Sequence, residues 1–189
     1  MVLAGCRDSS ATQSGPSTLN VATAATTASP PQLVARFSRL DCNVIGDQIP
    51  SLGRLTVLDR VSLPDPANSP ALGTSRDPRP ATPGLALFAK DGLGIKTGGS
   101  WRISVPAEAV GHLLIGWGSP GVPSLGVGPP TCQLPASSSG WMWFPGGYWT
   151  DRAGCYPLVV EAGGRSQPVT VGVGAPCPGQ QPPQGQSDR

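Results

Sequence analysis

Five cysteines and one histidine are the residues of this chain best suited to chemistry. The cysteines stand at positions 6, 42, 132, 155 and 177, and no two of them form a CxxC pair. A structural zinc site needs four Cys or His ligands in short-range pairs, and a blue-copper site needs two histidines beside a cysteine. We therefore expect no metal and no other cofactor.

The histidine, His112, lies in an apolar stretch that has no nucleophile-elbow motif. To act as a catalytic base it would need an acidic or nucleophilic partner within hydrogen-bonding reach. The acidic residues Glu108, Asp151 and Glu161 are scattered, and none stands in the context of a glycosidase acid pair. We expect a structural His112 and no enzymatic activity; a hydrolase that uses His112 or an acid pair is the alternative.

The charge of the chain excludes other classes of partner. Charged residues make up 13% of the sequence and the net charge is +2, which is no electrostatic footprint for nucleic acid. Gly92-Leu93-Gly94 lacks the third glycine and the following helix of a phosphate-binding loop. We expect a protein that binds neither nucleic acid nor nucleotide phosphates.

Aromatic residues crowd into positions 141–149, which hold three of the five tryptophans. Trp141 and Trp143 alternate with Met142 and Phe144, so that both faces of a strand would be apolar, as in a buried central strand. We expect a turn at residues 145–147 after it. The pattern favours a core role; the alternative is a glycan-binding face, whose ligand-binding residues would be Tyr148, Trp149, Asp151 and Arg152.

Near the N-terminus, Leu3-Ala4-Gly5-Cys6 resembles the lipobox of bacterial lipoproteins. The resemblance implies cleavage before Cys6, a lipid on that cysteine and membrane attachment, with residues 1–5 as the remnant of a signal peptide. The charged and apolar parts of such a peptide would precede Met1. The overall layout is similar to uncharacterised cell-surface lipoproteins of actinobacteria, which implies a lipid-anchored protein of the cell envelope with an unknown protein or glycan partner.

The segments outside the expected domain have the composition of flexible chain. Residues 7–32 are dominated by Ser, Thr, Ala, Pro and Gly, and residues 178–189 are rich in Pro, Gln and Gly. Such segments bury too little apolar surface to fold. We expect a lipidated tether over residues 6–32, a folded domain over 33–177 and a disordered tail over 178–189.

Short apolar runs separated by Gly and Pro predict strands and turns throughout the domain. We expect strands within 33–42, 53–61, 101–105, 110–117, 155–161 and 168–173, with one helical turn possible within 107–114. We expect hairpin turns at residues 90–92 and 163–164, and a proline-rich loop over 62–84. The sequence predicts an all-β, antiparallel β-sandwich, immunoglobulin-like in architecture.

With Cys6 carrying lipid, Cys42, Cys132, Cys155 and Cys177 would form two disulfides in one of three connectivities. The turn at 163–164 places Cys155 opposite Gly172, and a straight strand would then carry Cys177 too far away for a bond. This geometry favours Cys132–Cys155 and Cys42–Cys177.

Overall fold

The computed structural model describes residues 35–41, 46–47, 50–51, 53–77, 84–118, 121–131 and 139–184, all within one compact unit, residues 32–189. The lipobox with Cys6, the expected tether, Cys42 and Cys132 lie outside the described residues. Within the described ranges, no helix is long and apolar enough to cross a bilayer.

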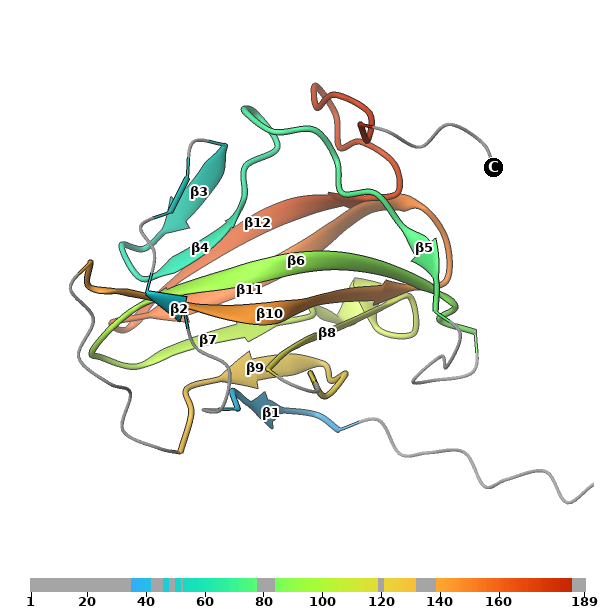
Figure 1. Ribbon diagram of the computed structural model, residues 1–189. Coiled ribbons are helices and arrows are strands. Elements are labelled where there is room, and N and C mark those ends of the chain that lie inside the picture. The colour runs from blue at the N-terminus through green and yellow to red at the C-terminus, as the bar shows by residue number, and fades with distance from the viewer. Residues whose placement is uncertain are drawn as a thin grey trace, which may run out of the picture. The chain divides into compact units, whose positions relative to one another are not determined.

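Two β-sheets pack face to face (Figure 1). The seven-stranded sheet has the order β2-β10-β6-β4-β3, with β5 also paired to β6 and β8 to β10; the five-stranded sheet has the order β1-β9-β7-β11-β12. Every pair of strands is antiparallel except β1 with β9. The strands are β1 (Ser38–Arg39), β2 (Gly46–Asp47), β3 (Arg54–Val57), β4 (Val61–Pro64), β5 (Ser75–Arg76), β6 (Leu87–Lys96), β7 (Trp101–Ser104), β8 (Leu113–Trp117), β9 (Gly126–Gly128), β10 (Trp141–Thr150), β11 (Gly154–Ala162) and β12 (Arg165–Val173).

A hydrophobic core contributed by both sheets fills the space between them. Leu63, Leu93 and Phe144 come from the seven-stranded sheet, and Ile103 and Leu158 from the five-stranded sheet; all five are fully buried. This is the antiparallel β-sandwich, immunoglobulin-like in general architecture, that the sequence predicts.

Several local predictions are confirmed. β7 alternates buried Trp101 and Ile103 with exposed Arg102, and β8 is buried throughout. A 3-10 turn, Ala107–Ala109, precedes β8. The β11–β12 hairpin closes at Gly163 and Gly164, with Cys155 opposite Gly172.

The turns predicted at residues 90–92 and 145–147 are wrong. Residues 90–92 lie inside β6 and residues 145–147 inside β10, and these two ten-residue strands pair along their whole length. A Cβ on Gly146 would overlap the backbone of Gly116 and Trp117, and one on Gly147 would overlap the carbonyl of Ala89. Glycine is therefore required here by the close approach of neighbouring strands, not by a turn.

Pro145 fits into the centre of β10 because of a gap on one side of the strand. Its carbonyl accepts the N–H of Gly118, so the backbone groups of Pro145 face away from β6. On that side, β2 pairs only with Met142 and Trp143, and β8 begins its pairing at Gly146. The missing N–H of Pro145 thus removes no hydrogen bond between strands.

Three predictions near the N-terminal end of the domain also need correction. The single strand expected over 53–61 is a hairpin, in which Leu58 and Asp59 form the turn with φ of 52° and 53°. The expected loop over 62–84 contains most of β4 and all of β5, although residues 78–83 lie outside the described ranges. Phe37, expected on a half-buried face, is 48% exposed.

Candidate functional site

Of the four residues proposed to bind a glycan, the two aromatics, Tyr148 and Trp149, belong to the interior, whereas Asp151 is partly exposed and Arg152 is exposed. Tyr148 is fully buried and meets the Trp117 ring edge-to-face, with 5.4 Å between centroids. Trp149 is 8% exposed, packs against Phe88 and donates its indole N–H to Asp77 Oδ2 at 2.9 Å. The favoured prediction of a core role is confirmed for Tyr148 and Trp149, and the alternative of an exposed platform on these two residues is wrong.

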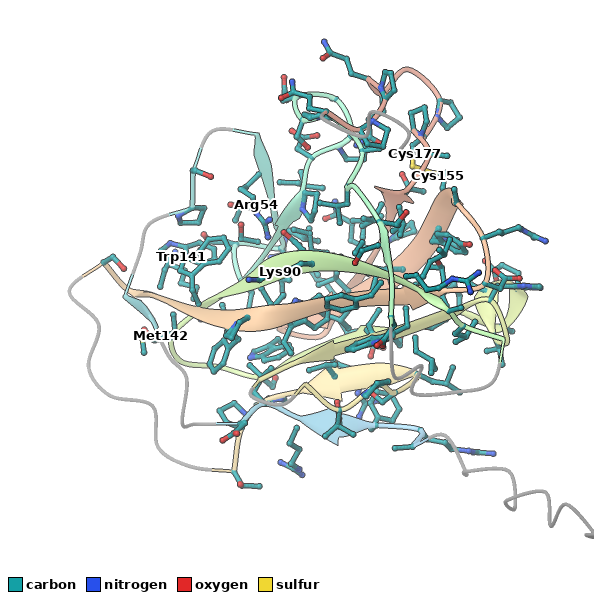
Figure 2. The ribbon with its side chains drawn as sticks, turned by 45° about the vertical axis from the view of Figure 1, so that its right-hand side comes forward. Arg54, Lys90, Trp141, Met142, Cys155 and Cys177 are labelled. Carbon is teal, nitrogen blue, oxygen red and sulfur yellow. A yellow bond between two sulfur atoms is a disulfide. The ribbon has the colours of Figure 1, made fainter. Side chains whose placement is uncertain are left out.

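A buried ion pair lies beside this cluster, between Arg54 of β3 and Asp91 of β6. Arg54 Nη1 contacts Asp91 Oδ1 at 2.6 Å, and its Nη2 donates to the carbonyls of Ser62 and Gly92 (Figure 2 labels Arg54). Tyr148 donates to the second carboxylate oxygen at 3.4 Å. The sequence analysis missed this pair because the two residues are 37 positions apart and no local pattern connects them.

Burial dominates the electrostatics of this pair. It raises the pKa of Asp91, against the opposing effect of the adjacent Arg54 guanidinium. Burial, together with the charge of Asp91, raises the pKa of Tyr148 well above its ordinary value. Because both carboxylate oxygens of Asp91 and both Nη atoms of Arg54 have hydrogen-bond partners within the protein, we assign the pair a structural role.

A second polar cluster joins the start of β8 to the β10–β11 connection. His112 Nδ1 lies 2.7 Å from Asp151 Oδ2, and Tyr156 donates to Asp151 Oδ1 at 3.3 Å and to the Arg152 carbonyl at 2.6 Å. The His112 and Asp151 side chains are 44% and 26% exposed. The structure thus brings His112 together with Asp151, the single carboxylate among the predicted ligand-binding residues, a contact that the sequence analysis did not foresee.

The electrostatics of this cluster favour an ionised Asp151. Burial pushes the pKa of Asp151 upward, but the hydrogen bond from His112 and the charges of His112 and Arg152 outweigh it, so that the pKa is lowered. Burial and the Asp151 charge raise the pKa of Tyr156. A carboxylate that accepts from Nδ1–H leaves Nε2 as the basic nitrogen, which is the arrangement of a general base. Among the described residues, however, no serine, threonine or cysteine side chain is hydrogen-bonded to His112.

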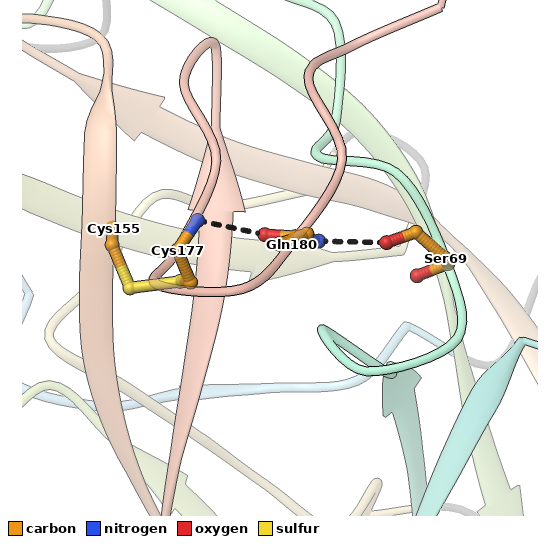
Figure 3. Close-up of a disulfide and its surroundings, with 4 residues drawn as sticks. All are labelled: Ser69, Cys155, Cys177 and Gln180. Carbon is orange, nitrogen blue, oxygen red and sulfur yellow. Dashed lines mark hydrogen bonds between the residues drawn. A yellow bond between two sulfur atoms is a disulfide. The ribbon is translucent and has the colours of Figure 1, made fainter.

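Cys155 and Cys177 form a disulfide, with 4.7 Å between their Cα atoms (Figure 3). The predicted pairings of Cys155 with Cys132 and of Cys177 with Cys42 are therefore wrong. The predicted register, with Cys155 opposite Gly172, is confirmed. However, β12 does not continue straight to Cys177, because it ends just before Gly174, which has a φ of 69° and pairs with Gly154. The chain turns back there, and Cys177 returns to β11.

The segment after the disulfide is held in place, so the expected disordered tail does not begin at residue 178. Gln180 is 8% exposed; its Oε1 accepts the Cys177 N–H at 2.9 Å and its Nε2 donates to the Ser69 carbonyl at 3.0 Å (Figure 3). The carbonyl of Gln181 accepts the N–H of Ala71. Residues 174–184 thus form a C-terminal strap that packs on residues 69–72.

Two open hollows of about 310 Å³ each lie on the domain. One is lined by Gly53, Arg54, Pro64, residues 69–72 and Gln184. The other, which we call the hairpin groove, is lined by residues 100–102 and 161–166, where β7 begins beside the β11–β12 turn. No group of three or more His, Cys, Asp or Glu side chains in the described ranges is placed to hold a metal ion.

Comparison of the chain with protein-family models, with curated proteins and with solved structures found no match. The function is therefore argued from the residues and the geometry of this chain alone.

Proposed function

We propose that this protein is exported and anchored by lipid to the outer face of a bacterial cell membrane, where its β-sandwich acts as a binding or scaffolding module without catalysis. The observation that carries the proposal is the Cys155–Cys177 disulfide. Disulfides form and persist in oxidising compartments outside the cytoplasm and are rare inside it. The bond therefore supports export of the domain.

The anchor is proposed from the sequence. Leu3-Ala4-Gly5-Cys6 supplies a lipobox, and cleavage before Cys6 would leave a cysteine to carry lipid. A random coil with the composition of residues 7–32 spans on the order of 30 Å, enough to hold the folded domain clear of lipid headgroups. Attachment would thus come from the lipid on Cys6.

A binding role is favoured over catalysis by how the polar side chains are used. Arg54 and Asp91 are buried and contact each other, so they are not accessible to a ligand. The hairpin groove, in contrast, presents the charged side chains of Arg102 and Glu161 to solvent. Ligands bind such accessible polar groups, whereas fully satisfied buried pairs mainly maintain structure.

Intact mass spectrometry of the protein from its native membrane fraction tests this proposal. We expect a chain that begins at Cys6 with a diacyl or triacyl addition, and a gain of two hydrogens per disulfide on reduction. A C6S variant should lose the lipid but keep the Cys155–Cys177 bond. An unmodified chain that retains Met1 and has free thiols would refute both export and anchoring.

A hydrolase is the second candidate, because the acidic partner that His112 requires is present in Asp151. Esterase, amidase and glycosidase substrates can be assayed with the wild-type chain and with H112Q and D151N variants whose folding is checked by circular dichroism. Turnover that both substitutions abolish would favour the hydrolase. Absence of turnover in the wild type would favour the binding module.

A further inference from the structure

Four exposed side chains at one edge of the five-stranded sheet form what we call the edge patch: Arg36, Phe37, Arg39 and Arg102. β1, which lies beside β9, ends the strand order of this sheet, and Figure 1 shows it at the margin of the sandwich. Arg102 belongs to β7, on the other side of β9, and its guanidinium lies 4.5 Å from the centroid of the Phe37 ring. The edge thus gathers three arginines beside one phenyl ring.

The strand register places Arg39 and Arg102 on the same, outer face of the sheet. Ile103 and Val127 pair with each other and are fully buried in the core, so that Arg102 and Gly128, the next residues along their strands, face outward. Arg39 pairs with Gly128 and therefore faces the same way. A Cβ on Gly128 would meet no atom within 4 Å, so the surface between the two arginines is open.

Phe37 is held in position although it is 48% exposed. Its ring packs on Gly126, where a Cβ would overlap it, and the Arg102 guanidinium lies over the ring. An apolar ring in this position gains free energy when a partner removes it from water. The edge patch therefore offers a partner an apolar contact as well as positive charge.

The positive charge of the edge patch is largely unopposed by the protein. Within the described ranges, no carboxylate forms an ion pair with Arg36 or Arg39. Arg102 Nε is 3.9 Å from Glu161 Oε2, which is an ion-pair distance and too long for a hydrogen bond, and the Arg102 side chain is 55% exposed. Three cations against one carboxylate favour an anionic partner.

An exposed aromatic ring among arginines fits a phospholipid surface better than a soluble anion. Basic side chains are attracted to anionic headgroups, and aromatic rings settle at the level of those headgroups. A soluble anion would use the guanidinium groups and leave Phe37 in water. β1 is also the first strand after the tether proposed over residues 6–32, and a coil of that length spans on the order of 30 Å. A lipid on Cys6 would thus keep the headgroups at a high effective concentration near the edge patch.

We infer that the edge patch docks the domain on the anionic phospholipid surface to which its tether is attached, with the arginines on headgroup phosphates and Phe37 among the headgroups. The inference rests on the proposed lipid anchor and adds a direct contact between the folded domain and the membrane. It orients the domain, because β12 is the opposite edge of the sheet and would face away from the membrane.

The test uses the full chain as a C6S variant with its disulfide formed, so that no lipid anchor contributes to binding. Sedimentation measures partition onto vesicles of equal parts phosphatidylglycerol and phosphatidylcholine, and onto vesicles of phosphatidylcholine alone. We expect binding to the anionic vesicles that weakens as salt is added, and little binding to the neutral ones. Adding R36Q/R39Q/R102Q should lower partition onto anionic vesicles about tenfold or more. Adding F37S instead should lower it about threefold.

The matched control is R76Q/K90Q/R152Q in the same C6S chain, because it removes the same charge from three exposed cations outside the five-stranded sheet. It should bind anionic vesicles like C6S alone, and circular dichroism checks that every variant is folded. The inference is overturned if C6S does not bind anionic vesicles, if the control weakens binding as much as R36Q/R39Q/R102Q, or if F37S binds as tightly as C6S alone. Because C6S carries no lipid, failure here and failure of the proposed anchor, which is read by intact mass, are distinguishable.

Discussion

At the scale of single residues, the polar side chains of this domain divide by burial. Arg54 and Asp91 are 12% and 7% exposed and contact each other within the sandwich, whereas Arg102 and Glu161 are about half exposed. Desolvation makes a buried charge costly without its partner, while a surface pair is screened by water. The two ion pairs should therefore respond differently to the loss of one member.

Replacing Asp91 with alanine should destabilise the domain by about 3–5 kcal/mol, because the Arg54 guanidinium would stay buried without a counter-charge. The matched control is Glu161→Ala, which opens a surface pair and should cost about 1 kcal/mol or less. Denaturant unfolding of both variants measures the difference. Equal costs for the two substitutions would contradict the structural role of the Arg54–Asp91 pair.

The Asp151 carboxylate should make stability depend on pH. Its pKa is lowered in the folded state, so the stabilisation is present above the ordinary carboxyl pKa and is lost as the pH falls through the folded pKa. At neutral pH, D151N should cost about 0.5–1 kcal/mol, since both partners are partly exposed. The gap between the wild type and D151N in unfolding free energy should close in acid; a gap independent of pH would contradict the prediction.

At the scale of the elements, β6 and β10 show how neighbouring strands override local turn signals. Lys90-Asp91-Gly92 and Pro145-Gly146-Gly147 both favour turns by residue type. In the sandwich, β10 pairs with both β6 and β8, and Gly146 and Gly147 face backbone atoms too close to admit a side chain. The hydrogen bonds of two long ladders outweigh the local preference for a turn.

Gly146→Ala should therefore destabilise the domain by about 2 kcal/mol or more, through steric overlap with Gly116 and Trp117. Gly128→Ala in β9 is the control, because a Cβ there meets no atom within 4 Å. Thermal unfolding should show a clear loss for G146A and little change for G128A. Similar melting temperatures would show that β10 has room for a side chain at Gly146.

At the scale of the whole molecule, the disulfide and the C-terminal strap close one end of the sandwich. The bond links β11 to a segment beyond β12, and Gln180 connects that segment to residue 69 (Figure 3). A cross-link reduces the conformational freedom of the unfolded chain. The strap should thus stabilise the whole domain although its residues make few core contacts.

Replacing both Cys155 and Cys177 with serine should cost about 3 kcal/mol, given a loop of 22 residues. Within the folded domain, limited proteolysis should then cleave first in residues 174–184, since the strap would be held by hydrogen bonds alone. The wild type treated with reductant is the control and should match the double variant. A variant as stable and as resistant to protease as the oxidised wild type would contradict this role.

The sequence alone determined the features that depend on neighbouring residues: the alternating strand β7, the buried strand β8 and the Gly163–Gly164 hairpin. Their side-chain period and turn chemistry act over a few positions and need no partner to be recognised. Together they were enough to predict an all-β sandwich.

Only the tertiary structure decided which distant residues meet. It converted two apparent turns into continuous strands, brought Asp151 to His112 across 39 positions, and returned Cys177 to Cys155 through the bend at Gly174. It also placed the Arg102 guanidinium on Phe37 beside Glu161. Such contacts depend on the pairing order of the strands and on where each strand ends, and the local sequence does not encode either.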